Sequence, residues 1–119
     1  MNLGKIIDCK KQLDSVFELR LQYPTNEKLC DLLIDIEKHY EKYVRLYDKL
    51  LKDYCDVVGV NENGTSQYRV KPENAEIYEQ ELQALNETPI ERDKYTIPPI
   101  KEATAKELMY LREFFNFSE

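Results

Sequence analysis

The stretch from Leu29 to Tyr54 constrains the fold of this chain more than any other feature of its sequence. Apolar and aromatic side chains recur there at alternating intervals of four and three residues, with no Gly or Pro between them: Leu29, Leu33, Ile36, Tyr40, Tyr43, Tyr47, Leu50 and Tyr54. A seven-residue repeat of this kind places one apolar seam along a single helix. At ~1.5 Å per residue that helix would span roughly 45 Å, so the seam needs partners along most of a long rod.

The other elements are predicted from the same kind of pattern. Apolar residues at helical spacing indicate four helices, over residues 3–20, 26–55, 72–86 and 105–116. Alternating valines followed by Asn63-Gly64 predict a β-hairpin over residues 57–70, because Asn and Gly tolerate the positive φ of a tight turn. The sequence therefore favours a mainly α fold in a single domain, residues 1–119. We expect an antiparallel helical hairpin or small helical bundle around one long helix, with a short β-hairpin between helices two and three.

Local signals indicate where these helices end. Thr25 is expected to cap the long helix with its hydroxyl, and Thr104 and Glu107 have the spacing of a capping box at the start of the last helix. Between the third and fourth helices the chain is extended. Four apolar residues are expected to pin it across the helices: Ile90, Tyr95, Ile97 and Ile100. Since the third helix can cover only half of the seam, helix one or helix four must cover the rest.

The charge and the cysteine content narrow the function classes. A net charge of −6 argues against a general nucleic-acid binder, which needs a basic surface for the phosphates. No run of residues approaches the ~18 apolar residues of a membrane span, and the first residues lack the continuous apolar stretch of a signal peptide. The cysteines, Cys9, Cys30 and Cys55, are odd in number and far apart, which is typical of free thiols in a reducing cytoplasm.

No set of residues in the sequence has the spacing of a catalytic or metal site. His39 is the only histidine, and on a charged part of the long helix it is more simply a solvated residue than a general base. The cysteines lack Cys-x-x-Cys spacing, and the three glycines, Gly4, Gly59 and Gly64, cannot form a phosphate loop. We therefore expect no enzymatic activity, no cofactor and no metal.

The first candidate surface is acidic. Residues 72–91 contain six Glu and no Lys or Arg. Helical spacing puts Glu73, Glu76 and Glu87 opposite the apolar stripe of the third helix, and we call these three residues the acidic strip. The strip either steers a basic protein partner toward the chain or is a solvated face that keeps the helix soluble.

The second candidate surface is aromatic. The chain has nine Tyr and no Trp, and Tyr43, Tyr47 and Tyr54 lie on the seam, where Leu would pack more simply. A buried phenol needs water or a partner for its hydroxyl, and Tyr is enriched at protein–protein contacts. This aromatic face is either an interface or the wet edge of a half-covered intramolecular seam. A surplus of apolar residues in the last helix adds weight to self-association or partner docking: Met109, Tyr110, Phe114 and Phe117.

The order of these parts along the chain carries a resemblance. The matching pieces are, in order, Leu21-Gln22-Tyr23-Pro24, Ile36-Glu37-Lys38-His39-Tyr40-Glu41-Lys42-Tyr43, Asn63-Gly64, Val70-Lys71-Pro72-Glu73-Asn74 and the segment from Leu108 to Phe117. In this order they resemble a family of small phage-encoded helical proteins, from phages of Gram-positive bacteria, that is catalogued as a domain of unknown function. The resemblance covers nearly the whole chain, and its motifs are architectural. It implies a phage or prophage origin and brings no catalytic residues with it.

These observations favour a non-enzymatic phage protein that acts by protein–protein binding in the bacterial host cytoplasm. Its partner would be a host or phage protein, for example a host defence or regulatory protein that it inhibits or modulates, and the chain could also form a homo-oligomer. Neither direct nucleic-acid binding nor membrane binding is expected. The alternatives are a structural or assembly accessory of the virion and a prefoldin-like helical hairpin that holds clients, the latter by analogy of shape.

Overall fold

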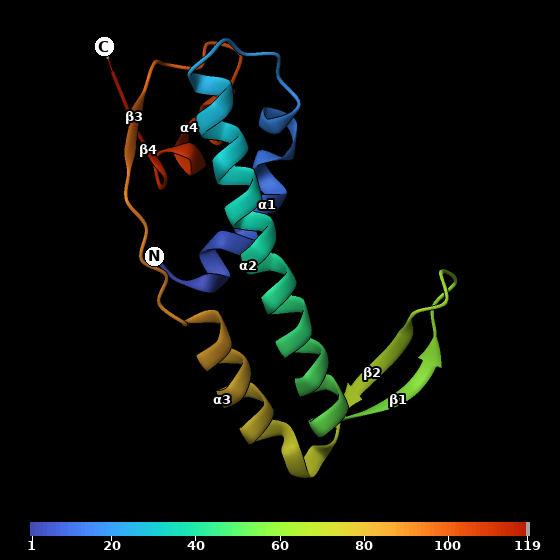
Figure 1. Cartoon of the computed structure of the whole chain (residues 1–119). Helices are drawn as coiled ribbons and strands as arrows, with labels where there is room; N and C mark the ends of the chain where they lie inside the picture. Colours follow the sequence, from blue (N-terminus) through green and yellow to red (C-terminus); the bar gives the residue numbers. More distant parts are fainter. Residues whose placement is uncertain (119) are drawn as a thin grey trace.

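The computed structural model describes residues 1–118 and is elongated, with principal extents of 54, 31 and 22 Å (Figure 1). Its α-helices are α1 (Leu3–Phe17), α2 (Thr25–Tyr54), α3 (Ala75–Asn86) and α4 (Ala105–Leu111). Two two-stranded sheets complete it, antiparallel β1 (Cys55–Val60) with β2 (Ser66–Val70) and parallel β3 (Tyr95–Ile97) with β4 (Phe115–Phe117). A 3-10 helix, η1 (Pro72–Asn74), leads into α3. The prediction of a mainly α chain is confirmed.

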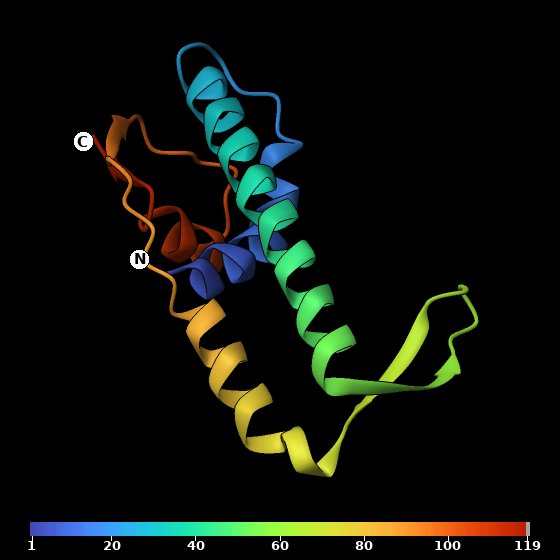
Figure 2. The same cartoon turned by 60° about the horizontal axis from the view of Figure 1, so that its bottom comes forward.

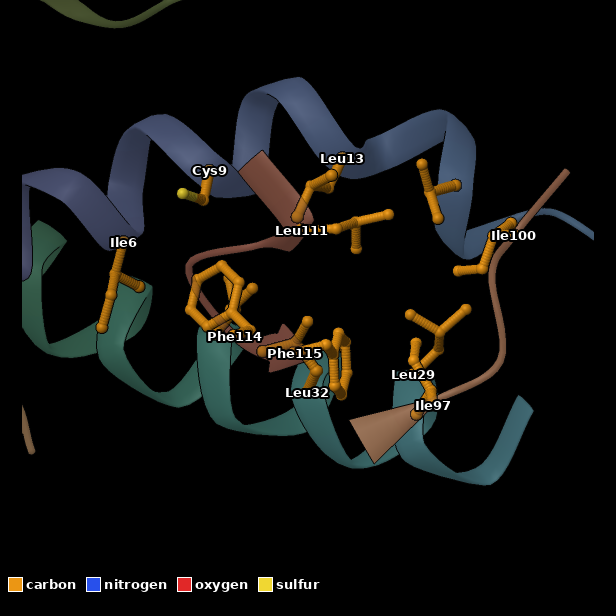
Figure 3. Packing of buried hydrophobic residues seen from close by; sticks show 12 residues of the cluster. Ile6, Cys9, Leu13, Leu29, Leu32, Ile97, Ile100, Leu111, Phe114 and Phe115 are labelled. Atoms are coloured by element: carbon orange, nitrogen blue, oxygen red, sulfur yellow. The ribbon is translucent and has the colours of Figure 1, made fainter. Parts of the chain in front are cut away.

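The hydrophobic core lies at one end of the molecule, around the first half of α2. There α1 packs along α2, and β3, β4 and α4 complete the cluster (Figures 1 and 3). The apolar spacing of α1 places Ile6 and Leu13 on one face, and both are fully buried. They belong to one cluster with Leu32 of α2 and with the rings of Phe114 and Phe115. Helix one therefore covers the part of the seam that α3 does not reach, as expected.

The residues of the seam become less buried from the beginning of α2 to its end. Leu29 and Ile36 in the first half are 5% and 1% exposed, whereas Tyr43 and Tyr47 in the second half are only half-buried. The short helix α3 runs antiparallel beside this second half (Figures 1 and 2). Within Ala75–Asn86 only Leu85 is buried. The second half of the seam is thus shielded by one short helix, and its edges reach the surface.

The β1–β2 hairpin connects α2 to α3 and projects away from the end of α2 (Figures 1 and 2). Its turn follows the predicted chemistry, because Gly64 has a φ of +85° and the backbone N–H of Thr65 donates a hydrogen bond to Asn63 Oδ1 at 3.1 Å. The strands pair antiparallel from Cys55 opposite Val70 to the turn, with a bulge after Val57. The predicted hairpin is present and begins directly where α2 ends.

The C-terminal segment differs from the helix predicted over residues 105–116. The helix α4 ends at Leu111, and Phe115–Phe117 pair as a strand with Tyr95–Ile97. Phe114 and Phe115 are neighbours in sequence, and each is 1% exposed. In a helix, adjacent side chains point about 100° apart, so two neighbouring rings would not both be directed at the centre of the core. A turn followed by a short strand allows both to be buried.

Helix ends agree with the prediction at α4 and differ at α1 and α2. The capping box is present: the backbone N–H of Glu107 donates to Thr104 Oγ1 at 3.1 Å, and that of Thr104 donates to Glu107 Oε1 at 2.8 Å. Thr25 is not the cap of α2, because Pro24 occupies that position and Thr25 is the first helical residue, with its side chain turned into the protein. The helix α1 ends at Phe17 rather than near residue 20.

The extended segment between α3 and α4 crosses the helices as predicted, with different anchors. Ile97 and Ile100 are buried, Ile90 is half-buried, and Tyr95 is exposed beneath the ammonium group of Lys28, 4.6 Å from its ring centroid. Tyr95 is therefore not the apolar pin that was expected. Its place is taken by Arg92, which pairs with Asp35 of α2 and fastens the segment there.

Candidate functional site

The predicted aromatic face joins α2 to α3 within the chain. The Tyr43 hydroxyl donates a hydrogen bond to Asn86 Oδ1 at 3.0 Å, and the Tyr78 hydroxyl donates to the Tyr47 hydroxyl oxygen at 3.4 Å. The rings of Tyr43 and Tyr47 are stacked, with centroids 6.0 Å apart and planes 11° apart. These phenols are therefore polar tethers between two helices that share little core.

Tyr54 closes the same contact at the far end of α2. Its ring is half-buried, and its carbonyl oxygen accepts hydrogen bonds from the backbone N–H of Lys71, at 3.1 Å, and from Asn74 Nδ2, at 3.5 Å. The three predicted aromatic residues thus share one side of α2. None is fully buried, so their edges remain accessible from outside.

The environment of the phenols keeps them protonated. Burial raises the pKa of Tyr43, with a smaller contribution from Tyr47. Burial also raises the pKa of Tyr78, and the hydrogen bond to Tyr47 raises it further. Both hydroxyls therefore remain neutral donors through the physiological pH range, which suits a structural role and offers no phenolate nucleophile.

An open notch lies between the second half of α2 and the β1–β2 hairpin. Two adjoining hollows of about 510 and 390 Å³ form it. We call this surface the hairpin notch and define it by Val44, Tyr47, Leu51, Val58, Tyr68 and Val70. The helical wall carries Val44, Tyr47 and Leu51, which repeat at intervals of three and four residues and so share one flank of α2.

The second wall is the apolar face of the hairpin. Residues opposite each other in an antiparallel pair share a face, and the register places Val57 with Tyr68 and Cys55 with Val70. The other face carries Asp56, Gln67 and Arg69, which are exposed. Within β1 three valines remain largely uncovered, at 58%, 50% and 67% exposure: Val57, Val58 and Val60. The hairpin is therefore amphipathic, with an apolar face that residues 1–118 leave open.

A second open surface lies between α2 and α3 on the other flank of the seam. It is a groove of about 420 Å³. We call it the interhelical groove, lined by Leu46, Lys49, Leu50, Asp53, Tyr54, Glu81, Ala84, Leu85 and Thr88. The groove and the hairpin notch have no lining residue in common.

The acidic strip lies on the outside of α3 and beside it. Glu73, Glu76 and Glu87 are all exposed. Gln80 Nε2 donates to Glu76 at 3.5 Å and Gln83 Nε2 donates to Glu87 at 3.1 Å, and within residues 1–118 none of the three carboxylates forms an ion pair. The strip does not line the hairpin notch, so the acidic and aromatic candidates are not brought together into one site.

The apolar surplus predicted for the last helix mostly enters the core. Phe114 is 1% exposed, and Tyr110 and Phe117 are half-buried against the cluster. Met109, at 59% exposure, is the one residue of that set left in the open. The interpretation of this segment as a docking surface is wrong, because the chain leaves the helix after Leu111 and folds these rings inward.

The polar side chains near the core have a structural arrangement. His39 Nε2 lies 3.6 Å from Asp35 Oδ1, and the other carboxylate oxygen of Asp35 binds Arg92. With 22% of its side chain exposed, His39 is less solvated than expected. Within residues 1–118 no cluster of three His, Cys, Asp or Glu could hold a metal ion. In the same part of the chain, no helix has the length and apolar character to cross a membrane.

The hairpin notch was not predicted from the sequence. In the sequence, Val44 and Leu51 form with Tyr40 and Tyr47 a second apolar line at intervals of four and three residues. That line, followed at once by the valines of β1, was the signal available. What it lacked was the direction in which the hairpin leaves α2, which no local pattern encodes.

No family model, curated protein or solved structure matches the chain. The resemblance to small phage-encoded helical proteins therefore stays a prediction. Function has to be argued from the exposed surfaces themselves.

Proposed function

We propose that the protein acts without enzymatic chemistry, by binding another protein through the hairpin notch. The observation that carries this proposal is the uncovered apolar face of the hairpin, on which Val58 is 50% exposed. A lone two-stranded hairpin is marginally stable in water, and contiguous exposed apolar surface marks interaction sites. A partner segment seated between the two walls would bury both and stabilise the hairpin.

The chemistry of the walls defines the partner segment. Among residues 1–118, the one charged side chain that lines the notch is Asp48, and Lys52 neutralises it at 2.9 Å. Binding would therefore come from apolar burial and depend little on salt. An amphipathic helix that lays its apolar face into the notch meets these conditions. From the resemblance we propose a host protein as the partner, in a phage-infected cell.

The test is capture of partners with matched variants. Val58→Lys puts a charge inside the notch, and Ile34→Lys makes the same kind of change at an exposed apolar residue in the first half of α2, which lines neither the notch nor the apolar face of the hairpin. Because these side chains are 50% and 61% exposed, neither substitution opens a cavity. We expect one stoichiometric partner to be retained by the wild type and by Ile34→Lys and lost by Val58→Lys. Equal retention by all three proteins contradicts the proposal.

A second measurement addresses the hairpin directly. Amide hydrogen exchange in β1 and β2 should slow when the captured partner is added back, because burial protects a hairpin that opens easily on its own. If the partner is a phage structural protein, the same protection would point to the alternative role in the virion. Binding that leaves exchange in the hairpin unchanged contradicts the use of the notch.

A further inference from the structure

The interhelical groove has charges of opposite sign along its two edges, so a second copy of the same chain is complementary to it. We propose that two copies of this chain associate through the interhelical groove, about a two-fold axis parallel to α2 and α3. The groove lies on the flank of the seam away from the hairpin notch, and the two surfaces share no lining residue. The inference therefore stands or falls separately from the partner binding proposed above.

The centre of this surface is apolar and open. Leu46 of α2 is 40% exposed and Ile77 of α3 is 42% exposed. Ile77, Glu81 and Ala84 recur at intervals of four and three residues, so they form one line along α3, and the latter two line the groove. With the half-buried Leu50 between the helices, the surface is a shallow apolar strip suited to another helix pair.

Charges of opposite sign flank this strip. Five basic residues of α2 recur at intervals of four, three, four and three residues and form one stripe: Lys38, Lys42, Arg45, Lys49 and Lys52. Every charged residue of η1, α3 and the turn after it is a Glu, among them Glu81 in the groove and the acidic strip beside it. Asp53, near the end of α2, is the exception on the basic side. The apolar centre of the groove thus has a basic edge on α2 and an acidic edge on α3.

This arrangement selects one symmetry. A two-fold axis parallel to the helices lays α2 of one copy over α3 of the other, twice, so each basic edge meets an acidic edge. An axis across the helices would lay α2 over α2 and oppose the two basic stripes. An isologous interface of the first kind satisfies both copies at once, and the four helices then have antiparallel neighbours, as in helical bundles.

The register within one copy shows which charges meet. Tyr43 bonds to Asn86, so Lys42, which precedes Tyr43, is level with Glu87, which follows Asn86. Lys49 lies six residues after Tyr43 on α2, and Glu81 lies five residues before Asn86 on α3, so Lys49 is close to the level of Glu81. An axis parallel to the helices keeps these levels, so in the dimer Lys42 faces Glu87 of the second copy and Lys49 faces Glu81 of the second copy.

The size of the surface limits the affinity. The 12 residues of α3 extend about 18 Å at ~1.5 Å per residue, so the interface is small. A small surface with charges at its rim and an apolar centre predicts a weak dimer, with a Kd of about 1–100 µM. Sedimentation over a wide range of protein concentrations is the appropriate measurement.

The decisive experiment uses two charge-reversed proteins. One carries Lys42→Glu with Lys49→Glu, and the other carries Glu81→Lys with Glu87→Lys. Each alone opposes like charges at four places, because the two-fold axis repeats both pairs, so we expect each to be monomeric, with a Kd raised roughly 100-fold or more. Mixed in equal amounts, the two proteins restore every opposite pair, and we expect a heterodimer about as stable as the wild-type dimer.

Controls separate this outcome from other causes. Lys101→Glu with Lys106→Glu changes the net charge as the lysine reversal does, at exposed residues that do not line the interhelical groove, and this variant should still dimerise. The Val58→Lys variant should also dimerise, since Val58 lies in the other surface. A wild-type protein that is monomeric up to millimolar concentration overturns the inference. So does a dimer that survives both reversals, or a mixture of the two variants that stays monomeric.

Discussion

The Tyr78 hydroxyl donates a hydrogen bond to the Tyr47 hydroxyl oxygen 3.4 Å away, and so joins α3 to α2 where neither helix is deeply buried. The bond from Tyr43 to Asn86 does the same nearer the core. The half of the molecule that carries both open surfaces is therefore held by polar tethers and half-buried rings. The stability of this half of the molecule should therefore depend on the ionisation of its phenols, whereas the stability of an apolar core would not.

The first prediction concerns alkaline pH. In the folded protein the pKa values of Tyr43 and Tyr78 lie above the ordinary value of 10.0. Below pH 10 these phenols are protonated in both the folded and the unfolded chain, so they cause no pH dependence of the free energy of unfolding. As the pH rises above 10, the unfolded chain loses them first and binds fewer protons than the folded one, so the free energy of unfolding falls. Urea unfolding at a series of pH values should show this loss.

A double variant, Tyr43→Phe with Tyr78→Phe, is the control for that prediction. It should lose about 0.5–1.5 kcal/mol per hydrogen bond at neutral pH. Its stability should then decline less steeply than that of the wild type above pH 10, because these two phenols no longer titrate. Equal slopes in the two proteins would show that other groups dominate the alkaline loss.

The second prediction concerns the C-terminal segment. Phe114→Ala removes a fully buried ring from the core, and we expect unfolding to become easier by about 3–5 kcal/mol in chemical denaturation. Met109→Ala, at a residue 59% exposed in the preceding helix, should change stability by only about 0.5 kcal/mol. A small effect of Phe114→Ala would contradict the burial of this ring in the core.

The third prediction ranks the three thiols. Cys30 is exposed, whereas Cys9 is fully buried and burial raises its pKa to about 11. Cys55 is 7% exposed, and its pKa is raised by burial and by the nearby Asp56 carboxylate. Alkylation needs a thiolate and access to it, so native protein should be modified at Cys30 first, then Cys55, and at Cys9 last. Peptide mapping by mass spectrometry reads this order, which should vanish in denaturant.

Elements specified by local pattern were predictable from the sequence. The heptad of α2, the Asn63-Gly64 turn and the Thr104–Glu107 capping box each depend on residues within a few positions of one another, and each is present. The pairing of β3 with β4 was not predictable. It joins three-residue strands nearly twenty positions apart, and three residues are too few to show the period of a strand.

The surfaces show the same division. The acidic residues of α3 and the phenols of α2 were visible in the sequence. In the structure the acidic strip is exposed on the outside of α3, whereas Tyr43 and Tyr47 bond to that helix. The basic stripe from Lys38 to Lys52 was equally visible, but it had no meaning before the register of α2 against α3 placed Lys42 level with Glu87. The periodicity of a single helix does not encode the register between two helices. Only that register shows that the basic residues of α2 and the acidic residues of α3 lie at matching levels.

The last prediction concerns the ion pair between Arg92 and Asp35, which fastens the extended segment to α2. The Arg92 side chain is 15% exposed, lies 5.5 Å from the centroid of the Phe114 ring, and keeps its Nε buried without an acceptor among the described residues. Asp35→Ala therefore leaves a largely buried guanidinium without its counter-charge, and we expect a loss of about 1–3 kcal/mol in denaturant unfolding. Arg92→Met keeps the apolar contact with the ring and should cost less.

The two substitutions should not be additive. Once Arg92 is Met, no buried charge remains to be neutralised, and the Asp35 carboxylate, 36% exposed, has only His39 beside it. The protein with both Asp35→Ala and Arg92→Met should therefore be more stable than the one with Asp35→Ala alone. A double-mutant cycle measures this directly. Additive losses would mean that solvent already screens the guanidinium, and the segment would then be fastened by its apolar anchors and by the pairing of β3 with β4.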